Sequence, residues 1–219
     1  MNLKNLKYLF LLMMAVVALA SCSEDEETST EYANWQTRNE KAFADTLAYA
    51  RQQIAAGNTD EWKVILNYSF SGQTATQDVS GSSAVLKYDD TKYIVVHVLD
   101  KGKGAETPLY TDSIQMSYRG RLIPTDSYAN GYAFDQTFNG TFDKSTALPT
   151  KTTVNTGYID GFTTALLSMH PGDHWQVFIP YGLGYGSTAQ TSIPAYSTLR
   201  FEMALHSLKH LSASKWVAE

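Results

Sequence analysis

The stretch GYIDGFTTALLSMHPGDHWQVFIP, residues 157–180, carries the strongest structural signal in the sequence. Its first half has apolar residues at positions i, i+3, i+4 and i+7, which predicts about two turns of helix with one apolar face. These positions are Phe162, Ala165, Leu166 and Met169. Asp160 is the expected N-cap, and Pro171-Gly172 is expected to end the helix. Residues 174–180 predict a strand, so a short helix followed at once by a strand forms the centre of the expected fold.

Strand-like runs lie on either side of this stretch. Before it they span residues 61–70, 84–102, 112–122 and 132–135, and after it comes 198–208. Strands, then one short helix, then two more strands predict an antiparallel sheet folded against a single helix. The expected fold class is α+β.

A longer helix is predicted near the N-terminus, from Tyr32 to Ala56, because this segment lacks Gly and Pro and has one apolar face. The apolar positions are Trp35, Phe43, Leu47, Ala50 and Ile54. One interpretation packs this face on the domain that follows. The other makes the helix an arm that forms a homodimer or holds a partner, since a lone amphipathic helix cannot bury its own apolar stripe.

The first 21 residues predict a signal peptide, with Lys4 and Lys7 before an apolar run that is too short to span a bilayer. LASC, ending at Cys22, resembles the lipobox of bacterial lipoproteins, in which this cysteine carries the lipid. Residues 22–31 are acidic and polar and predict a solvated tether that resembles the surface-export signal of Bacteroidetes lipoproteins. The expected location is the cell envelope, anchored to the outer membrane through Cys22, on its periplasmic face or at the cell surface.

Composition and motifs argue against most catalytic chemistries. The net charge of −5 with scattered basic residues argues against nucleic acid, and Cys22 as the only cysteine excludes internal disulfides. His206 and His210 are four residues apart, but no further ligand motif supports a metal, and no cofactor is expected. The acids near the aromatic segment leave a carboxylate-pair hydrolase open as a minor alternative. They are Asp135, Asp143 and Asp160.

An aromatic pocket with little charge suits one reaction in particular. Rotation about an X–Pro bond breaks no covalent bond, and its barrier of about 18–20 kcal/mol comes from amide resonance. Apolar walls that desolvate the imide, with one or two hydrogen-bond donors for its carbonyls, can lower this barrier. The segment 180–205 has three tyrosines, three glycines and a single acid, Glu202, and so fits this requirement.

Four motifs occur in the order found in the FKBP-type peptidyl-prolyl isomerases, and residues 92–208 resemble that family. DSIQMSYRGRL (112–122) is similar to V-x-Y-x-G-x-L, and GYAFDQT (131–137) to G-x-x-F-D-S. The stretch 157–180 is similar to V-I-x-G-W-x-E-G-L-x-x-M-x-x-G followed by a strand that ends in I-P. The last motif is Y-G followed by I-P and an alternating strand, here at 185–205. The resemblance implies an FKBP-like sheet wrapped on one short helix, preceded by an N-terminal helix and extra strands.

The resemblance also implies the site. The tyrosine of Y-G, here Tyr185, is expected to donate a hydrogen bond to a substrate carbonyl, and the backbone N–H of Ile159 to bind another. Asp135 would polarise the pocket edge. The remaining lining residues would be Tyr118, Phe134, Tyr158, Phe162, Ile193 and Phe201. Phe162 stands where the family usually has tryptophan, and the loop 187–192 lacks the usual aromatic or histidine tip.

The sequence therefore predicts an exported isomerase that acts on proline-containing polypeptides as a folding helper. The alternative is a non-catalytic FKBP-like surface lipoprotein that binds a peptide, a protein or a glycan. The expected segments are a signal peptide (1–21), a tether (22–31), a helix and strand extension (32–91), the isomerase domain (92–211) and a C-terminal tail (212–219).

Overall fold

The computed structural model describes residues 30–70 and 88–219, and the predicted signal peptide and nearly all of the tether lie outside them. The chain divides into two units, Met1–Ala33 and Asn34–Glu219. The described part of the first unit contains a 3-10 turn, Thr30–Tyr32. Both α-helices and every described strand belong to the second unit, residues 34–219.

One antiparallel sheet forms the framework of this unit, and within the described residues it has eight strands in the order β1-β2-β6-β7-β3-β4, with β5 paired to β3 and β8 to β7. The strands are β1 (Trp62–Leu66), β2 (Tyr93–Asp100), β3 (Ser113–Arg121), β4 (Ala133–Gln136), β5 (Thr150–Thr153), β6 (His174–Ile179), β7 (Leu199–Lys209) and β8 (Val217–Ala218). The two helices are α2 (Trp35–Ala55) and α3 (Asp160–Leu166). This architecture confirms the predicted α+β class.

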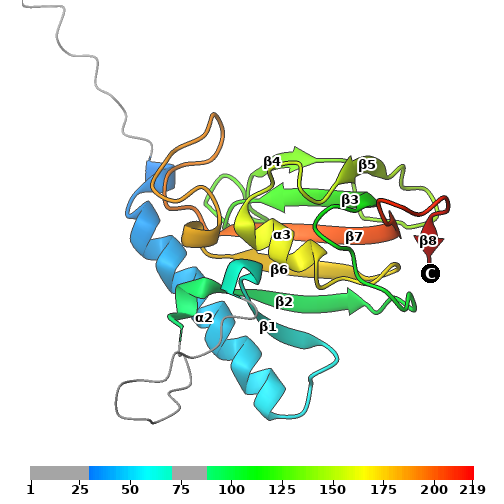
Figure 1. Ribbon diagram of the computed structural model, residues 1–219. Coiled ribbons are helices and arrows are strands. Elements are labelled where there is room, and N and C mark those ends of the chain that lie inside the picture. Colours follow the sequence, from blue (N-terminus) through cyan, green and yellow to red (C-terminus); the bar gives the residue numbers. More distant parts are fainter. Residues whose placement is uncertain (1–29, 71–87) are drawn as a thin grey trace, which may run out of the picture. The chain divides into compact units, whose positions relative to one another are not determined.

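Helix α3 covers one face of the sheet and lies in front of β3, β7 and β6 in Figure 1. The inward residues of β6 and β7 alternate along each strand, as expected where one face is buried. Val177, Ile179, Phe201 and Met203 are buried in the same cluster as Phe162 of α3. The predicted apolar face of the short helix is therefore the side that closes the main core.

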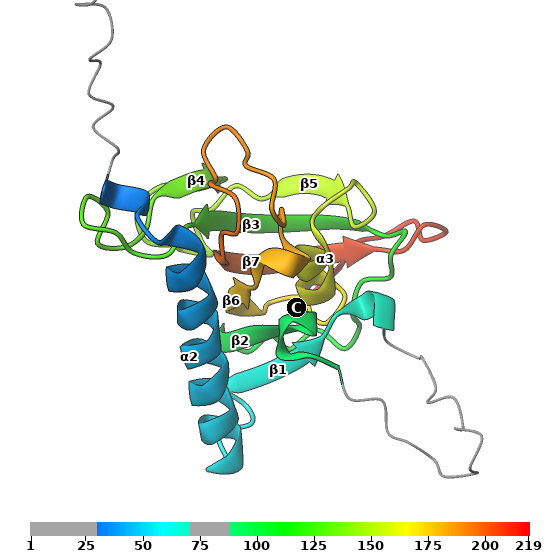
Figure 2. The same ribbon diagram turned by 90° about the vertical axis from the view of Figure 1, so that its left-hand side faces the viewer.

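Helix α2 packs on the opposite face and runs past β6, β2 and β1 in both views (Figure 1 and Figure 2). Its buried stripe of Phe43, Leu47 and Ala50 contacts Val95 of β2 and Phe178 of β6. The stripe is thus covered within the chain, which confirms the interpretation that the helix packs on its own domain. A homodimer through this helix stays a prediction, and the apolar stripe no longer supports it.

Several boundaries differ from those expected. The N-cap of α3 is Ile159, and Asp160 is the first helical residue with no side-chain capping bond, so the predicted Asp160 cap was wrong. A short 3-10 turn, Tyr68–Phe70, replaces the end of the expected strand 61–70, and another, Asp90–Lys92, lies inside the expected strand 84–102, whose residues 84–87 are outside the described part. Strands β5 and β8 were not predicted, because β5 consists of threonines and a lysine with little burial and β8 has only two residues. Among the described residues, no helix is both long and apolar enough to cross a membrane.

Candidate active site

A pocket of about 290 Å³ opens between α3, the strands β3, β4 and β7 and the loop after β6. Its lining includes all nine residues named from the sequence, which come from five separate segments. They are Tyr118, Phe134, Asp135, Tyr158, Ile159, Phe162, Tyr185, Ile193 and Phe201. Gly157 and Ser192 complete the lining. The sequence interpretation missed these two, although each is next to a named residue.

Phe162 forms the floor of the pocket and is only 2% exposed. Its ring contacts three others, with centroid distances of 5.6 Å to Tyr118, 4.8 Å to Tyr158 and 5.0 Å to Phe201. Phe134 extends the wall by packing edge-on against Phe201 at 5.5 Å. Most of these contacts have the edge-to-face geometry that aromatic pairs prefer, so the walls hold one another in place.

Gly120 makes room for this wall. A β-carbon at this position of β3 would lie 2.5 Å from the Phe134 ring and 2.7 Å from the Phe201 ring. No side chain larger than hydrogen fits there unless both rings move. The glycine of the Y-x-G motif thus allows Phe134 and Phe201 to meet over the strand.

Asp135 and Tyr118 form the polar edge of the pocket. The Tyr118 hydroxyl donates a hydrogen bond of 2.7 Å to Oδ2 of Asp135. Burial of the phenol and this hydrogen bond raise the pKa of Tyr118 well above its usual range. Asp135 is the only charged side chain in the pocket lining, and it lies at the end of β4 opposite Gly120. The carboxylate is therefore oriented by Tyr118 from the neighbouring strand.

Two hydrogen-bond donors remain available at the pocket. The Tyr185 hydroxyl has no hydrogen-bond partner within the described part of the chain, and its side chain is 39% exposed. The backbone N–H of Ile159, just before α3, likewise has no acceptor among residues 30–70 and 88–219. Burial, and secondarily the charge of Asp135, raises the pKa of Tyr185, so this phenol keeps its proton at neutral pH.

The loop after β6 positions Tyr185 and Ile193. A 3-10 turn, Tyr181–Leu183, follows Pro180, and the Gly186 N–H donates to the Tyr181 carbonyl at 2.9 Å. Further along, the Gln190 N–H donates to the Ile193 carbonyl at 2.8 Å and closes a tight turn. Residues 187–192, which lack an aromatic or histidine side chain, thus form a compact turn that places Ile193 in the pocket wall.

The catalytic and binding roles of these nine residues stay predictions, while their common location is a structural fact. The pocket offers aromatic rings, the free donors of Tyr185 and Ile159, the side chain of Ser192 and one carboxylate. No group of three or more potential metal-ligating side chains occurs in the part of the chain that the structure describes.

Comparisons with known proteins agree with this geometry. Residues 104–206 match the family model of the FKBP-type peptidyl-prolyl cis-trans isomerases. These residues form an FKBP-type domain. All nine named residues lie inside the matched range, from Tyr118 on β3 to Phe201 on β7.

The chain is also similar to several curated proteins. It is 35% identical over 117 residues to the macrophage infectivity potentiator of Trypanosoma cruzi, covering 53% of each chain. It is 37% identical over 109 residues to the FKBP-type 22 kDa peptidyl-prolyl cis-trans isomerase of Escherichia coli, covering 49% of this chain and 46% of that one. A protein of Legionella longbeachae named outer membrane protein MIP is 32% identical over 117 residues, which is 51% of this chain and 42% of that one. The chain thus spans about half the length of the curated relatives it matches.

Among solved structures, a peptidyl-prolyl cis-trans isomerase from Pseudomonas syringae aligns with 20% identity and a TM-score of 0.43, covering 76% of this chain and 96% of that one. The assignment of the FKBP-type domain rests on the family model and the curated relatives.

Proposed function

We propose that this protein is a peptidyl-prolyl cis–trans isomerase whose active site is the pocket floored by Phe162. The proposal rests on one observation above the others: nine residues from five segments converge on a pocket that has apolar walls and two unpaired donors. The FKBP-type domain supports it, because curated relatives of that domain carry isomerase names.

The pocket geometry explains how rotation is accelerated. The proline ring of the substrate enters over Phe162, between Tyr118, Phe134 and Phe201, and its imide leaves water. Loss of water hydrogen bonds disfavours the planar, charge-separated form of the amide, which is the source of its barrier of about 18–20 kcal/mol. No proton is transferred and no covalent bond is broken.

The two free donors hold the twisted substrate. The Tyr185 hydroxyl and the Ile159 N–H bind carbonyl oxygens on the two sides of the rotating bond. Because these donors are fixed before the substrate binds, they stabilise the rotated geometry without reorganising. Asp135 adds a local negative charge at the edge where the imide nitrogen becomes pyramidal and more basic.

The test is the rate of cis–trans exchange in an X-Pro tetrapeptide, measured by NMR exchange or by a protease-coupled assay. We expect the wild-type protein to accelerate exchange well above the uncatalysed rate, which has a time constant of tens to hundreds of seconds. The Tyr185→Phe variant removes one neutral hydrogen bond of about 1 kcal/mol and should lower kcat/KM about fivefold.

Tyr128→Phe is the matched control, since Tyr128 is an exposed tyrosine outside the pocket lining. Its kcat/KM should equal that of the wild type. Exchange at the uncatalysed rate in the wild-type protein would contradict the proposal. If the same peptide nevertheless bound in the pocket, the non-catalytic alternative would take its place.

We also propose that the chain is an exported lipoprotein of the cell envelope, anchored to the outer membrane through Cys22. The sequence LASC and the name of the Legionella longbeachae relative support this, while the residues concerned lie outside the described part. Cys22→Ala should abolish labelling by a palmitate probe and release the protein from the membrane fraction. Membrane retention of that variant would overturn the anchor.

On this proposal, residues 1–21 are removed, residues 22–31 form the tether, and the clients are proline-containing polypeptides in the envelope. The helix and strand extension of residues 32–91 supports the domain of residues 92–211, with residues 212–219 as a tail.

A further inference from the structure

Three arginines gather on the face of the sheet that is opposite the isomerase pocket. Arg119 and Arg121 of β3 alternate with Tyr118 and Gly120, which face the pocket, and so they point to the other side. Arg200 of β7 alternates with Phe201 in the same way. Together these arginines line a second pocket, of about 250 Å³, whose other lining residues are Asn130, Gln176 and Glu202.

The strand register places two of these positive charges directly opposite each other. Arg121 pairs with Arg200 across β3 and β7, and the next pair on this face is Arg119 with Glu202. Like charges directly opposite on neighbouring strands destabilise a sheet. The Arg121–Arg200 pair therefore lowers the stability of the protein unless a counter-charge lies between them.

The guanidinium groups are held in place but not fully hydrogen-bonded. Arg121 donates from Nη1 to the Gly131 carbonyl at 2.8 Å, and Arg119 donates from Nη2 to the Gly140 carbonyl. Arg119 is only 8% exposed, and its guanidinium lies 4.2 Å from the centroid of the Phe138 ring. The buried Nε atoms of Arg119 and Arg200 have no hydrogen-bond partner among the described residues.

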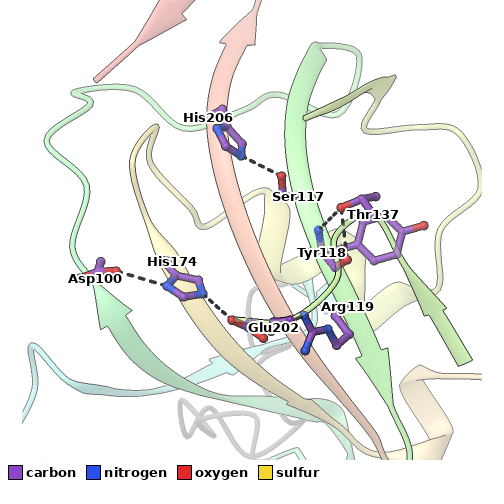
Figure 3. Close-up of polar contacts among 9 residues, drawn as sticks. Asp100, Ser117, Tyr118, Arg119, Thr137, His174, Glu202 and His206 are labelled. Carbon is purple, nitrogen blue, oxygen red and sulfur yellow. Dashed lines mark hydrogen bonds and ion pairs between the residues drawn. The ribbon is translucent and has the colours of Figure 1, made fainter. Parts of the chain in front are cut away.

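Glu202 cannot balance these charges alone. Its Oε1 lies 3.0 Å from Nε2 of His174, whose Nδ1 lies 3.2 Å from Oδ2 of Asp100. Figure 3 shows this chain of contacts, with Arg119 beside Glu202 on the same face. Three guanidiniums and one carboxylate leave an excess of two positive charges in the pocket. Burial and, secondarily, the neighbouring charge of Arg121 lower the pKa of Arg200, and burial lowers the pKa of Arg119 even though the charge of Glu202 acts in the opposite direction.

We propose that this pocket, which we call the arginine pocket, binds a phosphate dianion, either free or as the monoester group of a larger molecule. A phosphate monoester carries about −1.5 to −2 charges at pH 7, which matches the excess positive charge. Its three terminal oxygens accept hydrogen bonds from guanidinium forks, the donors that bind phosphate best. The pocket volume is several times the roughly 30 Å³ that one water occupies, so a phosphate group fits with a small organic substituent.

The site is independent of the isomerase pocket, because the two lie on opposite faces of the sheet and share no lining residue. Phosphate binding therefore does not depend on whether the FKBP-type domain is catalytically active. The phosphate would bind to β3 and β7 on the face of the sheet that is opposite the isomerase pocket.

The test is isothermal titration calorimetry of the full-length chain with sodium phosphate, at constant ionic strength set by chloride. We expect one site in the wild-type protein and binding at least about tenfold weaker in Arg121→Gln and in Arg200→Gln, since each loses a charge-assisted hydrogen bond. Arg51→Gln is the control: Arg51 is an exposed arginine of α2 paired with Asp90, and its removal should leave binding unchanged. Parallel titrations with O-phosphoserine and serine separate the two sources. Tighter binding of O-phosphoserine assigns the site to a monoester, and equal or weaker binding assigns it to free phosphate.

Thermal unfolding supplies a second readout that a purely structural role would not produce. Without phosphate, Arg121→Gln should unfold at the wild-type temperature or above it, because the repulsion from Arg200 is gone. With phosphate, the wild type should gain more stability than Arg121→Gln, since a ligand stabilises the folded state in proportion to how tightly it binds. The proposal is overturned if phosphate gives no heat beyond that of chloride, or if both variants bind phosphate as tightly as the wild type.

Discussion

At the scale of single residues, the hydroxyl of Tyr185 controls how the proposed activity depends on pH. A phenol can donate a hydrogen bond only while it is protonated. Because burial and the Asp135 charge raise the pKa of Tyr185 above its ordinary value of about 10, kcat/KM should stay constant from pH 7 to 9 and fall only above pH 10. A pH profile of the NMR exchange rate measures this.

Asp135→Asn tests the origin of that shift. The variant keeps an acceptor for the Tyr118 hydroxyl but removes the negative charge that disfavours both phenolates. The falling limb of the profile should therefore move to lower pH, and in Tyr185→Phe it should be absent. A limb at the same pH in all three proteins would show that Tyr185 does not hold the substrate.

The pocket residues that could be predicted from the sequence are those that belong to short sequence motifs. Tyr118, Asp135 and Tyr185 each stand in a pattern with a glycine or an aromatic neighbour, and the structure brings them to one pocket. The Tyr118–Asp135 hydrogen bond could not be predicted, because it depends on the register between β3 and β4. The arginine pocket was missed for the same reason: Arg121 and Arg200 are far apart in sequence and meet only through strand pairing.

At the scale of elements, Asn39 fixes helix α2 to the start of β7. It is fully buried in the apolar stripe of the helix, and its Oδ1 accepts a hydrogen bond of 2.8 Å from the Thr198 N–H. Its Nδ2 donates to the Trp35 carbonyl at 2.7 Å. Asn39→Ala leaves the buried Thr198 N–H without its acceptor and should lower the free energy of unfolding by about 1–3 kcal/mol.

Denaturant unfolding measures this loss, and Gln36→Ala, an exposed substitution one turn earlier, is its control. A loss no larger than that of the control would mean that the helix is held by its apolar contacts alone. Since β7 carries Phe201, Asn39→Ala should also loosen one wall of the isomerase pocket. Sequence periodicity identified the stripe but not Asn39, because a polar residue in an apolar pattern is normally discounted.

His210 links another pair of elements, the end of β7 and the connection between β2 and β3. Its Nδ1 lies 2.6 Å from Oδ2 of Asp112, and its Nε2 lies 3.0 Å from Oε2 of Glu106. These two carboxylates raise the pKa of His210 above its ordinary value of about 6.5. A raised pKa means that the folded state binds the proton more tightly, so the stabilisation is complete below about pH 6.5 and is lost as the pH rises through the folded-state pKa.

His210→Gln should therefore lower the melting temperature most at about pH 5.5 to 6, with the deficit shrinking at pH 8 to 9. Thermal unfolding of both proteins across this range measures the effect. Glu106→Gln removes one of the two carboxylates and should reproduce part of it. A deficit that is equal at every pH would show that His210 acts by packing and not by its charge.

At the scale of the whole second unit, the sheet extends beyond the family match. Residues 104–206 include neither β1 nor β2, yet β2 lies between β1 and β6 and pairs with both. The sequence predicted both strands and placed β2 in the isomerase domain of residues 92–211, but it assigned β1 to an extension, residues 32–91, that precedes the domain. Local sequence patterns could not show that β1 belongs to the same sheet, because strand pairing joins segments that are distant in sequence. Strand β1 pairs with β2 across a connection of more than 20 residues, and α2 covers the face that these two strands share with β6.

Helix α2 and strands β1 and β2 should consequently be required for folding. A fragment of residues 104–219 lacks several buried side chains of the two cores, among them Phe43, Leu47, Ile94, Val95 and Val96. Each buried apolar side chain contributes about 1.5–3 kcal/mol, so their loss removes most of the roughly 5–15 kcal/mol that stabilises a domain. It also leaves β6 as an unpaired edge, which favours aggregation.

Circular dichroism melting of three proteins tests this: the full chain, residues 34–219 and residues 104–219. The first two should unfold cooperatively at similar temperatures, because residues 34–219 contain both helices and every described strand. The third should show no cooperative transition and should aggregate. A cooperative transition in the third fragment, at the temperature of the other two, would show that the family-matched segment folds alone and that α2, β1 and β2 serve a purpose other than stability.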